Sequence, residues 1–172
     1  MNSTLSEEWF DIVDHQDQII GREPRSVVHA RGLNHRAVHI LLFNLQDEVF
    51  LQLRSPRKDN HPNVWDSSCS GHVDSGEDYD TAANRELEEE LGISQFGPHL
   101  SWLGKIEARE ETGREFVHVY RGQHEGPFRL HPDEISDGRF FPVLEVRRAL
   151  KETPEQFAPA FRYLWPLFFD RG

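Results

Sequence analysis

The sequence predicts an α/β protein, and three observations support this fold class. Apolar runs rich in β-branched residues, such as residues 37–43, predict buried strands. An apolar stripe at Ala83, Leu87 and Leu91 repeats every four residues and predicts an amphipathic helix. The 172 residues contain no internal repeat, low-complexity tract or linker, so we expect one domain spanning residues 1–172.

The N-terminal part of the chain is expected to consist mainly of strands. These strands are predicted at residues 10–14, 18–20, 37–43 and 49–54. One or two helical turns begin at Pro24, because proline suits the first turn of a helix. A turn at residues 45–48 joins the last two strands into a hairpin. Residues 55–63 are rich in proline, asparagine and basic side chains, which is typical of a loop.

The C-terminal part is expected to add a second pair of strands and two helices. The strands are predicted at residues 103–110, 116–121 and 138–141, and the helices at residues 142–151 and 157–169. The first two strands are joined near Gly113. Pro166 is expected to kink the last helix near its end, because proline removes a backbone donor.

The helix that contains the apolar stripe carries the most informative residues. Asp78 is a suitable N-cap, and Gly92 stands where a left-handed glycine ends a helix. Glu86, Glu89 and Glu90 are spaced i, i+3 and i+4, so they share one face and repel one another. Hard divalent cations such as Mg²⁺ prefer oxygen ligands of this kind. Taken alone, a glutamate-rich helix is more often a solvated surface helix than a metal site. The spacing of the residues around the helix distinguishes the two.

That wider spacing matches a known motif, and the chain resembles the Nudix hydrolase family. The box G-x5-E-x7-R-E-U-x-E-E-x-G-U is complete from Gly71 to Ile93, and its fixed positions are Gly71, Glu77, Arg85, Glu86, Glu89, Glu90 and Gly92. Leu87 and Ile93 fill the apolar U positions. The resemblance implies the Nudix fold, an α/β/α sandwich with a mixed β-sheet, in which the box forms a loop–helix–loop.

The resemblance also implies roles for the residues of the box. Glu86, Glu89 and Glu90 are expected to hold Mg²⁺, for which Mn²⁺ can substitute, and the carbonyl of Gly71 is a further expected ligand. Glu77, Arg85 and Gly92 are expected to hold the motif in shape. The general base is expected to be Glu86 or an acid outside the box, and the candidates for that acid are Glu115 and Glu134.

Composition limits the partners. The formal net charge is −11, which argues against a general nucleic-acid or anionic-membrane binder. Cys69 is the single cysteine, so no intrachain disulfide forms. The N-terminus lacks the pattern of a signal peptide, and no apolar run approaches 18 residues. We therefore expect a cytoplasmic protein that acts on a small molecule, and base rates favour a homodimer.

An acidic protein that handles an anionic substrate needs local cations. Arg54 precedes the basic loop and Lys58 lies within it, and both are expected to bind a diphosphate, whereas Arg57 is a weaker candidate and a solvated loop is the alternative. His72 is also expected to face the substrate. Three rings are candidates to stack on a base, although core packing is the more common role; they are Trp65, Phe116 and Tyr120.

Part of the chain is similar to the isopentenyl-diphosphate isomerases, a branch of the same family. Trp65-x4-Ser70-Gly71-His72 looks like the isomerase segment W-x4-C-G-H, and His35 and Lys58 also fit. The isomerase cysteine is replaced by Ser70, whose hydroxyl has a far higher pKa than a thiol.

Two further departures separate the chain from the isomerases. Cys69 falls one residue early, on the opposite face of the strand. The first metal-binding histidine of the isomerases would fall at Val28, which leaves His29 out of register. We therefore expect His35 and His72 to be structural or substrate-facing rather than ligands of a second metal.

These observations predict a Mg²⁺-dependent hydrolase that cleaves the diphosphate linkage of a nucleoside diphosphate derivative or a related organic diphosphate. An isopentenyl-diphosphate delta-isomerase is the main alternative, and Ser70 argues against it. A non-catalytic ligand sensor and a structural module are further alternatives. The complete set of acidic residues in the box argues against both.

Overall fold

Strand β3 (His35–Phe43) is the centre of a mixed sheet in the computed structural model, which describes residues 7–94 and 99–170. It pairs in parallel with β8 (Glu115–Gln123) and antiparallel with β6 (Cys69–His72). Strand β8 continues the sheet antiparallel to β7 (Ser101–Ile106). The predicted pair of C-terminal strands is thereby confirmed.

Strands β3 and β4 form the predicted hairpin and then separate. Strand β4 (Glu48–Arg54) pairs with β3 only at Leu42–Phe50 and Phe43–Val49. Strand β9 (Ile135–Pro142) pairs with β4 from Glu48 to Arg54, and β5 (Trp65–Asp66) pairs with β4 beyond its contact with β3. The two halves of the sheet therefore diverge, and β6 lies on the β3 side of the division.

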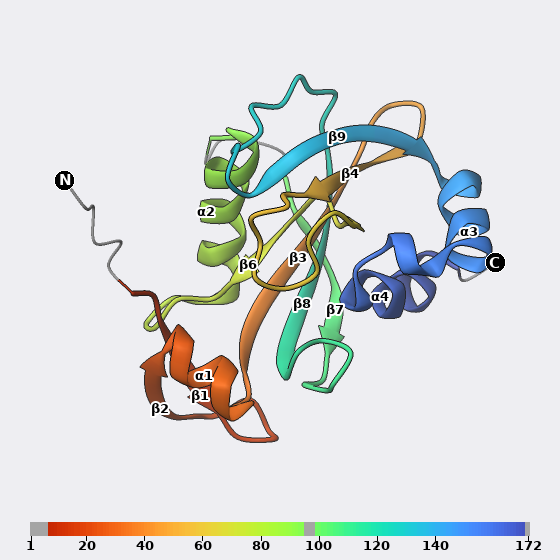
Figure 1. Ribbon diagram of the computed structural model, residues 1–172. Coiled ribbons are helices and arrows are strands. Elements are labelled where there is room, and N and C mark those ends of the chain that lie inside the picture. The colour runs from red at the N-terminus through yellow and green to blue at the C-terminus, as the bar shows by residue number, and fades with distance from the viewer. Residues whose placement is uncertain (1–6, 95–98, 171–172) are drawn as a thin grey trace.

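Helices cover both faces of the sheet, as the sandwich prediction requires (Figure 1). Val38, Ile40 and Leu42 alternate along β3 and pack with helix α2 (Tyr79–Leu91). Leu41 and Phe43 point to the other face, where α3 (Val143–Glu152) and α4 (Pro159–Phe169) lie. Two apolar clusters thus sandwich one sheet. Among the described residues, no helix has the length and hydrophobicity needed to cross a bilayer.

An N-terminal ribbon packs beside one end of β3. It consists of β1 (Trp9–Val13) and β2 (Ile19–Pro24), which pair antiparallel and lead into helix α1 (Arg25–Arg31). The ribbon is fastened through Asp17, which is buried. Its carboxylate accepts hydrogen bonds from Nε of Arg36 at 2.7 Å and from the hydroxyl of Tyr79 at 2.9 Å, and it contacts Nζ of Lys105 at 2.7 Å.

Three predicted boundaries were wrong. Strand β7 ends at Ile106 rather than at residue 110, because the following residues form a turn in which the Thr112 hydroxyl donates to two backbone carbonyls. Strand β9 is longer than predicted, because it pairs with β4 along that strand's whole length. Helix α4 begins at Pro159 rather than at Phe157, since the residue before a proline is disfavoured in a helix. A short 3-10 helix, η1 (Pro154–Gln156), precedes it.

Replacing Asp17 by asparagine is expected to lower the free energy of unfolding at pH 7 by about 3 kcal/mol, because it leaves buried cations without their anion. Burial alone would raise the pKa of Asp17, but Lys105, Arg36 and Tyr79 outweigh it and lower that pKa. The carboxylate therefore stabilises the fold above the pKa of the unfolded chain. Its contribution is lost as the pH falls below about 4.

Urea unfolding at pH 7 and pH 3 measures this difference. Asp47→Asn is the matched control, because Asp47 has a positive φ of 57°, close to the 61° of Asp17, but its side chain is exposed and pairs with Arg121. A surface pair of this kind is expected to contribute less than about 1 kcal/mol. Equal effects of the two variants at pH 7 would contradict the role assigned to Asp17.

Candidate active site

A cavity of about 570 Å³ lies where β3 and β4 separate. Its lining includes Ala37 and His39 from β3, Arg54 from β4 and the stretch Ser70–His72 from β6. Helix α2 contributes Glu86, Glu89 and Glu90, and the loops that follow β4, β7 and β8 contribute further lining residues. The cavity therefore brings together residues of the box and residues far from it in sequence.

The carboxylate pole, which consists of Glu86, Glu89 and Glu90, forms one wall of this cavity. Asp78 accepts a hydrogen bond from the backbone of Thr81 and caps α2, and Gly92 ends the helix in the left-handed conformation, both as predicted. Leu87 and Leu91 bury the opposite face. The local sequence therefore fixes which way the three glutamates point.

The three carboxylates differ in burial. Glu86 and Glu90 are 9% and 5% exposed, whereas the side chain of Glu89 is 57% exposed. Burial and the neighbouring charge of Glu90 raise the pKa of Glu86 well above its usual value. Burial also raises the pKa of Glu90 to about 7, although hydrogen bonds from Gln52 and from the backbone of Ser70 act against this rise. A cation between these groups would relieve the cost of their charge.

Arg85 braces the carboxylate pole from the side. Its guanidinium makes a bidentate contact with Glu77, at 2.8 and 2.9 Å, and donates to Oε1 of Glu86 at 2.8 Å and Oε2 of Glu89 at 3.2 Å. It also donates to the backbone carbonyl of His72 at 2.9 Å. The structure thus places Glu77 and Arg85 where they tie α2 to β6, in line with the structural role expected of them.

Gly71 lies directly against Glu86. A Cβ atom at position 71 would stand 2.1 Å from the carboxyl carbon of Glu86, a distance that no real contact allows. Glycine is therefore required here for close approach of strand and helix rather than for an unusual backbone conformation. Because Gly71 has no side chain, the buried carboxylate of Glu86 can lie directly against the backbone of β6 at the cavity wall.

The cations predicted to bind the substrate already have partners. Arg54 donates to Asp66 at 3.3 Å and to the carbonyls of Asn60 and His61, both at 3.0 Å. Lys58 pairs with Glu134, which also lines the cavity. Both residues line the cavity as expected.

Arg57 stands apart from these two cations. It pairs with Asp133 on the surface and does not belong to the lining among the described residues. This position agrees with its weaker candidacy for substrate binding.

A second cluster is formed by His29, His35, His72 and Glu115, and all of these except His35 belong to the cavity lining. The three histidines place one ring nitrogen each within 4.8 Å of one another. Nε2 of His72 and Nε2 of His35 lie 3.0 and 3.5 Å from Glu115. The expectation that His29 falls out of register was wrong. Its ring reaches the cluster from α1, whereas Val28 is fully buried.

This histidine cluster has the donor set of a transition-metal site. Burial and the nearby His72 and His35 lower the pKa of His29 to about 4, so its imidazole is neutral and able to ligate. Burial alone would raise the pKa of Glu115, but the contacts with His35 and His72 hold it well below its usual range. Nε2 of His35 is buried without a hydrogen-bond partner, which is what an absent cation would leave.

The candidate stacking rings do not line the cavity in the part of the chain that the structure describes. Trp65 packs edge-on against Phe141, Phe116 is fully buried, and the hydroxyl of Tyr120 donates to Asp80 at 2.6 Å. All three therefore serve packing, and a base would have to be held by other contacts.

The two residues compared with the isomerase cysteine lie as predicted. Ser70 lines the cavity, while Cys69 is fully buried in the apolar cluster under α2. Burial and the charges of Glu90 and Glu86 raise the pKa of the Cys69 thiol well above its usual value. The thiol is therefore neither accessible nor activated.

Sequence reasoning gave no role to several lining residues, among them His39, Asp66 and His131. Nδ1 of His39 lies 2.8 Å from the hydroxyl of Ser67, and Asp66 accepts from Arg54. No spacing in the sequence points to them, because each comes from a different strand or loop. Their place in the cavity follows from the sheet topology alone.

Binding of Mg²⁺ at pH 7 is expected to release about half a proton or more, because Glu90 has a raised pKa of about 7 and metal ligands must be ionised. The affinity for Mg²⁺ should fall as the pH drops from 8 to 6. Calorimetry in two buffers of different ionisation enthalpy measures the release. Glu90→Gln should reduce it, leaving only the share that comes from Glu86, and Glu88→Gln, on the exposed side of the same helix, should keep it in full. Binding without proton release would contradict the pKa assignment.

Replacing Gly71 by alanine is expected to displace the Glu86 carboxylate and to weaken Mg²⁺ affinity about tenfold, because the new methyl group occupies its position. The Mg²⁺-induced shift in melting temperature measures this loss. Gly21→Ala is the matched control, since no atom lies within 4 Å of a Cβ there. An unchanged shift in the Gly71 variant would show that Glu86 does not depend on this contact.

Comparisons with known proteins agree with this geometry. The family model of the NUDIX domain matches residues 33–163. An uncharacterized Nudix hydrolase of Pseudomonas aeruginosa is 37% identical over 155 residues, which cover 88% of this chain and 90% of that protein. Isopentenyl-diphosphate delta-isomerase 1 of Aromatoleum aromaticum is 30% identical over 149 residues, which cover 86% and 84%.

A solved structure shows the same architecture. The crystal structure of DR0079 from Deinococcus radiodurans superimposes with a TM-score of 0.85 at 26% identity, covering 94% of this chain and 99% of that one. The relatives of this chain thus include proteins named as Nudix hydrolases and proteins named as isomerases. The chain therefore belongs to the Nudix family, with a box that is complete and folded around a cavity.

Proposed function

We propose that this protein is a Mg²⁺-dependent hydrolase that cleaves the diphosphate linkage of a nucleoside diphosphate derivative or a related organic diphosphate. The observation that carries the proposal is the carboxylate pole, where two buried glutamates of raised pKa stand beside an exposed one at a cavity wall. Such perturbed groups in a cavity are typical of functional sites. Nudix proteins typically use divalent metals and bind small diphosphates, which supports the same assignment.

Glu86, Glu89 and Glu90 are the residues that would hold Mg²⁺, with the carbonyl of Gly71 as a further ligand. Bound there, the ion would supply charge neutralisation on the phosphate oxygens and a water of lowered pKa. Glu86 is the preferred general base, because it lies in the cavity wall with the other two carboxylates. Arg85 keeps Glu86 and Glu89 in place throughout.

Arg54 and Lys58 would hold the diphosphate from the other side of the cavity. Lys58 lies on a loop and pairs with Glu134, a bond that a phosphate can replace because both acceptors are anionic. Glu134, once released from Lys58, would offer a further carboxylate in the cavity lining. Arg54 is bound to two backbone carbonyls and so orients its loop as well.

An isopentenyl-diphosphate isomerase is the second candidate, and the histidine cluster is the observation that favours it. The cluster offers a second metal site beside the carboxylate pole, and relatives with that activity are about as long as this chain. Ser70 stands against it, because the only thiol, Cys69, is buried on the other face of β6. An unactivated hydroxyl is a poor proton donor or acceptor.

Product analysis separates the two candidates. The protein is incubated with Mg²⁺ and with nucleotide sugars, dinucleotides, nucleoside diphosphates or isopentenyl diphosphate, and the products are followed by phosphorus and proton NMR. Cleavage of a diphosphate linkage supports the hydrolase. Conversion of isopentenyl diphosphate to its allylic isomer with no cleavage of any compound would overturn it.

Replacing Glu89 by glutamine is expected to lower the Mg²⁺-dependent turnover about 100-fold or more, because it removes one anionic ligand without changing the shape of an exposed site. Initial rates over a range of Mg²⁺ concentrations measure the loss. Glu88→Gln is the matched control, one residue away and outside the cavity lining among described residues. Full turnover by the Glu89 variant would remove the carboxylate pole from the mechanism.

A further inference from the structure

The loop between β8 and β9, residues 124–134, is fastened across the carboxylate pole. Its backbone donates from Arg129 to the carbonyl of Leu91 at 3.0 Å and from His131 to the carbonyl of Glu90 at 2.9 Å. At its far end, the carbonyl of Glu134 accepts from the backbone of Ser55 at 2.9 Å. The loop therefore has a defined position relative to the C-terminal end of α2.

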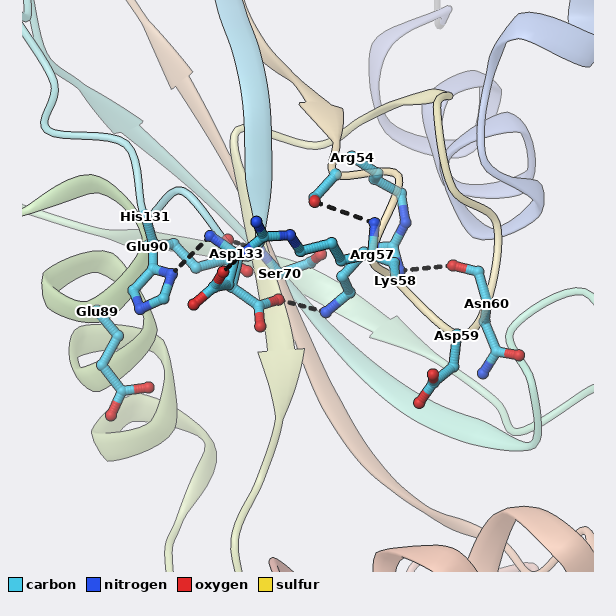
Figure 2. A network of polar contacts seen from close by, with 12 residues as sticks. Arg54, Arg57, Lys58, Asp59, Asn60, Ser70, Glu89, Glu90, His131 and Asp133 are labelled. Atoms are coloured by element: carbon cyan, nitrogen blue, oxygen red, sulfur yellow. Dashed lines mark hydrogen bonds and ion pairs between the residues drawn. The ribbon is translucent and has the colours of Figure 1, made fainter. Parts of the chain in front are cut away.

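His131 is the residue of this loop that places a ring N–H donor in the cavity lining. Its ring lines the cavity together with Glu89 and Glu90. Nδ1 accepts a hydrogen bond from the backbone N–H of Asp133 at 3.3 Å. Because Nδ1 is an acceptor, the neutral ring carries its proton on Nε2. Figure 2 shows that second nitrogen turned away from Asp133, toward the side on which Glu89 lies.

The Nε2–H group of His131 has no protein partner among the described residues, whereas the other strong donors at this wall are occupied. Lys58 pairs with Glu134, and Arg85 is bound to the glutamates and to the His72 carbonyl. A neutral N–H group can donate to an anion, and this one lies in the same cavity lining as the three carboxylates. It therefore complements the oxygen of a phosphate rather than a cation.

We propose that His131 is a substrate-binding residue whose Nε2–H donates to a non-bridging oxygen of the diphosphate held at the carboxylate pole. The inference rests on the proposed function and deepens it, because it assigns the recognition of the phosphate to a residue outside the box. The hydrogen bond from Asp133 sets the tautomer of His131, and the bond to Glu90 sets the position of its backbone.

Two substitutions of His131 separate this role from a structural one. Asparagine keeps an acceptor near the position of Nδ1 and so can preserve the bond from Asp133, but it lacks a group at the position of Nε2. Glutamine places its amide nitrogen near the position of Nε2 and loses the bond from Asp133. A substrate-binding role predicts that only asparagine weakens binding, and a structural role predicts the reverse.

The probe is methylenebisphosphonate, an analogue of diphosphate whose P–C–P bridge cannot be hydrolysed. It is titrated with Mg²⁺ into the full chain by calorimetry. His131→Asn is expected to weaken its Kd about tenfold or more, as loss of a hydrogen bond to a charged group does. His131→Gln is expected to stay within about threefold of the wild type. The affinity for Mg²⁺ alone should not change in either variant.

His124 provides the matched control. Its Nδ1 accepts from the backbone of Gly126 at 2.9 Å, in the same arrangement on the same loop, but its ring does not line the cavity among the described residues. His124→Asn should therefore leave binding unchanged. Wild-type affinity in His131→Asn, weak binding in His131→Gln, or an equal loss in His124→Asn would overturn the proposal for His131. A wild-type protein that fails to bind the bisphosphonate with Mg²⁺ would overturn the proposed function as well.

Discussion

The chemistry of the cavity depends on two carboxylates, Glu86 and Glu90, that lie one helical turn apart and are buried in its wall. Burial and mutual repulsion oppose the charge on Glu86 and Glu90, and the surrounding residues offset only part of this cost. Arg85 supplies the nearest positive charge, and the missing side chain at Gly71 supplies the space. The pole is thus held in shape by the protein but is short of positive charge, which makes it a site that a divalent cation would stabilise.

The second constraint is the separation of β3 from β4. Once the hairpin opens, β6 and β8 extend the sheet on one side and β9 and β5 on the other. The carboxylate pole and the histidine cluster then line the same cavity, and β6 contacts both, through Gly71 at the pole and through His72 in the cluster. The ion pair of Lys58 with Glu134 joins the two loops that lie across the opening.

The sequence was most informative where the relevant contacts are local. The cap at Asp78, the stop at Gly92 and the common face of the glutamates all follow from spacings of three or four residues, and the structure has them as predicted. It was least informative where partners lie far apart. The pairing of Lys58 with Glu134 joins residues 76 positions apart, and His29 reaches the cluster because a helix turns its ring inward. Neither the alternation of apolar residues nor the spacing of a motif can predict either contact.

The parallel register of β3 and β8 has a consequence for how this site can vary. His35 is the direct partner of Glu115 in that ladder, and His72 stands opposite Ala37 in the ladder of β3 and β6. The backbone hydrogen bonds of β3 therefore set the relative positions of three members of the histidine cluster, namely His35, His72 and Glu115. Insertions in the surrounding loops would leave the cluster intact, whereas one residue gained or lost within β3 would turn half of it to the opposite face of the sheet.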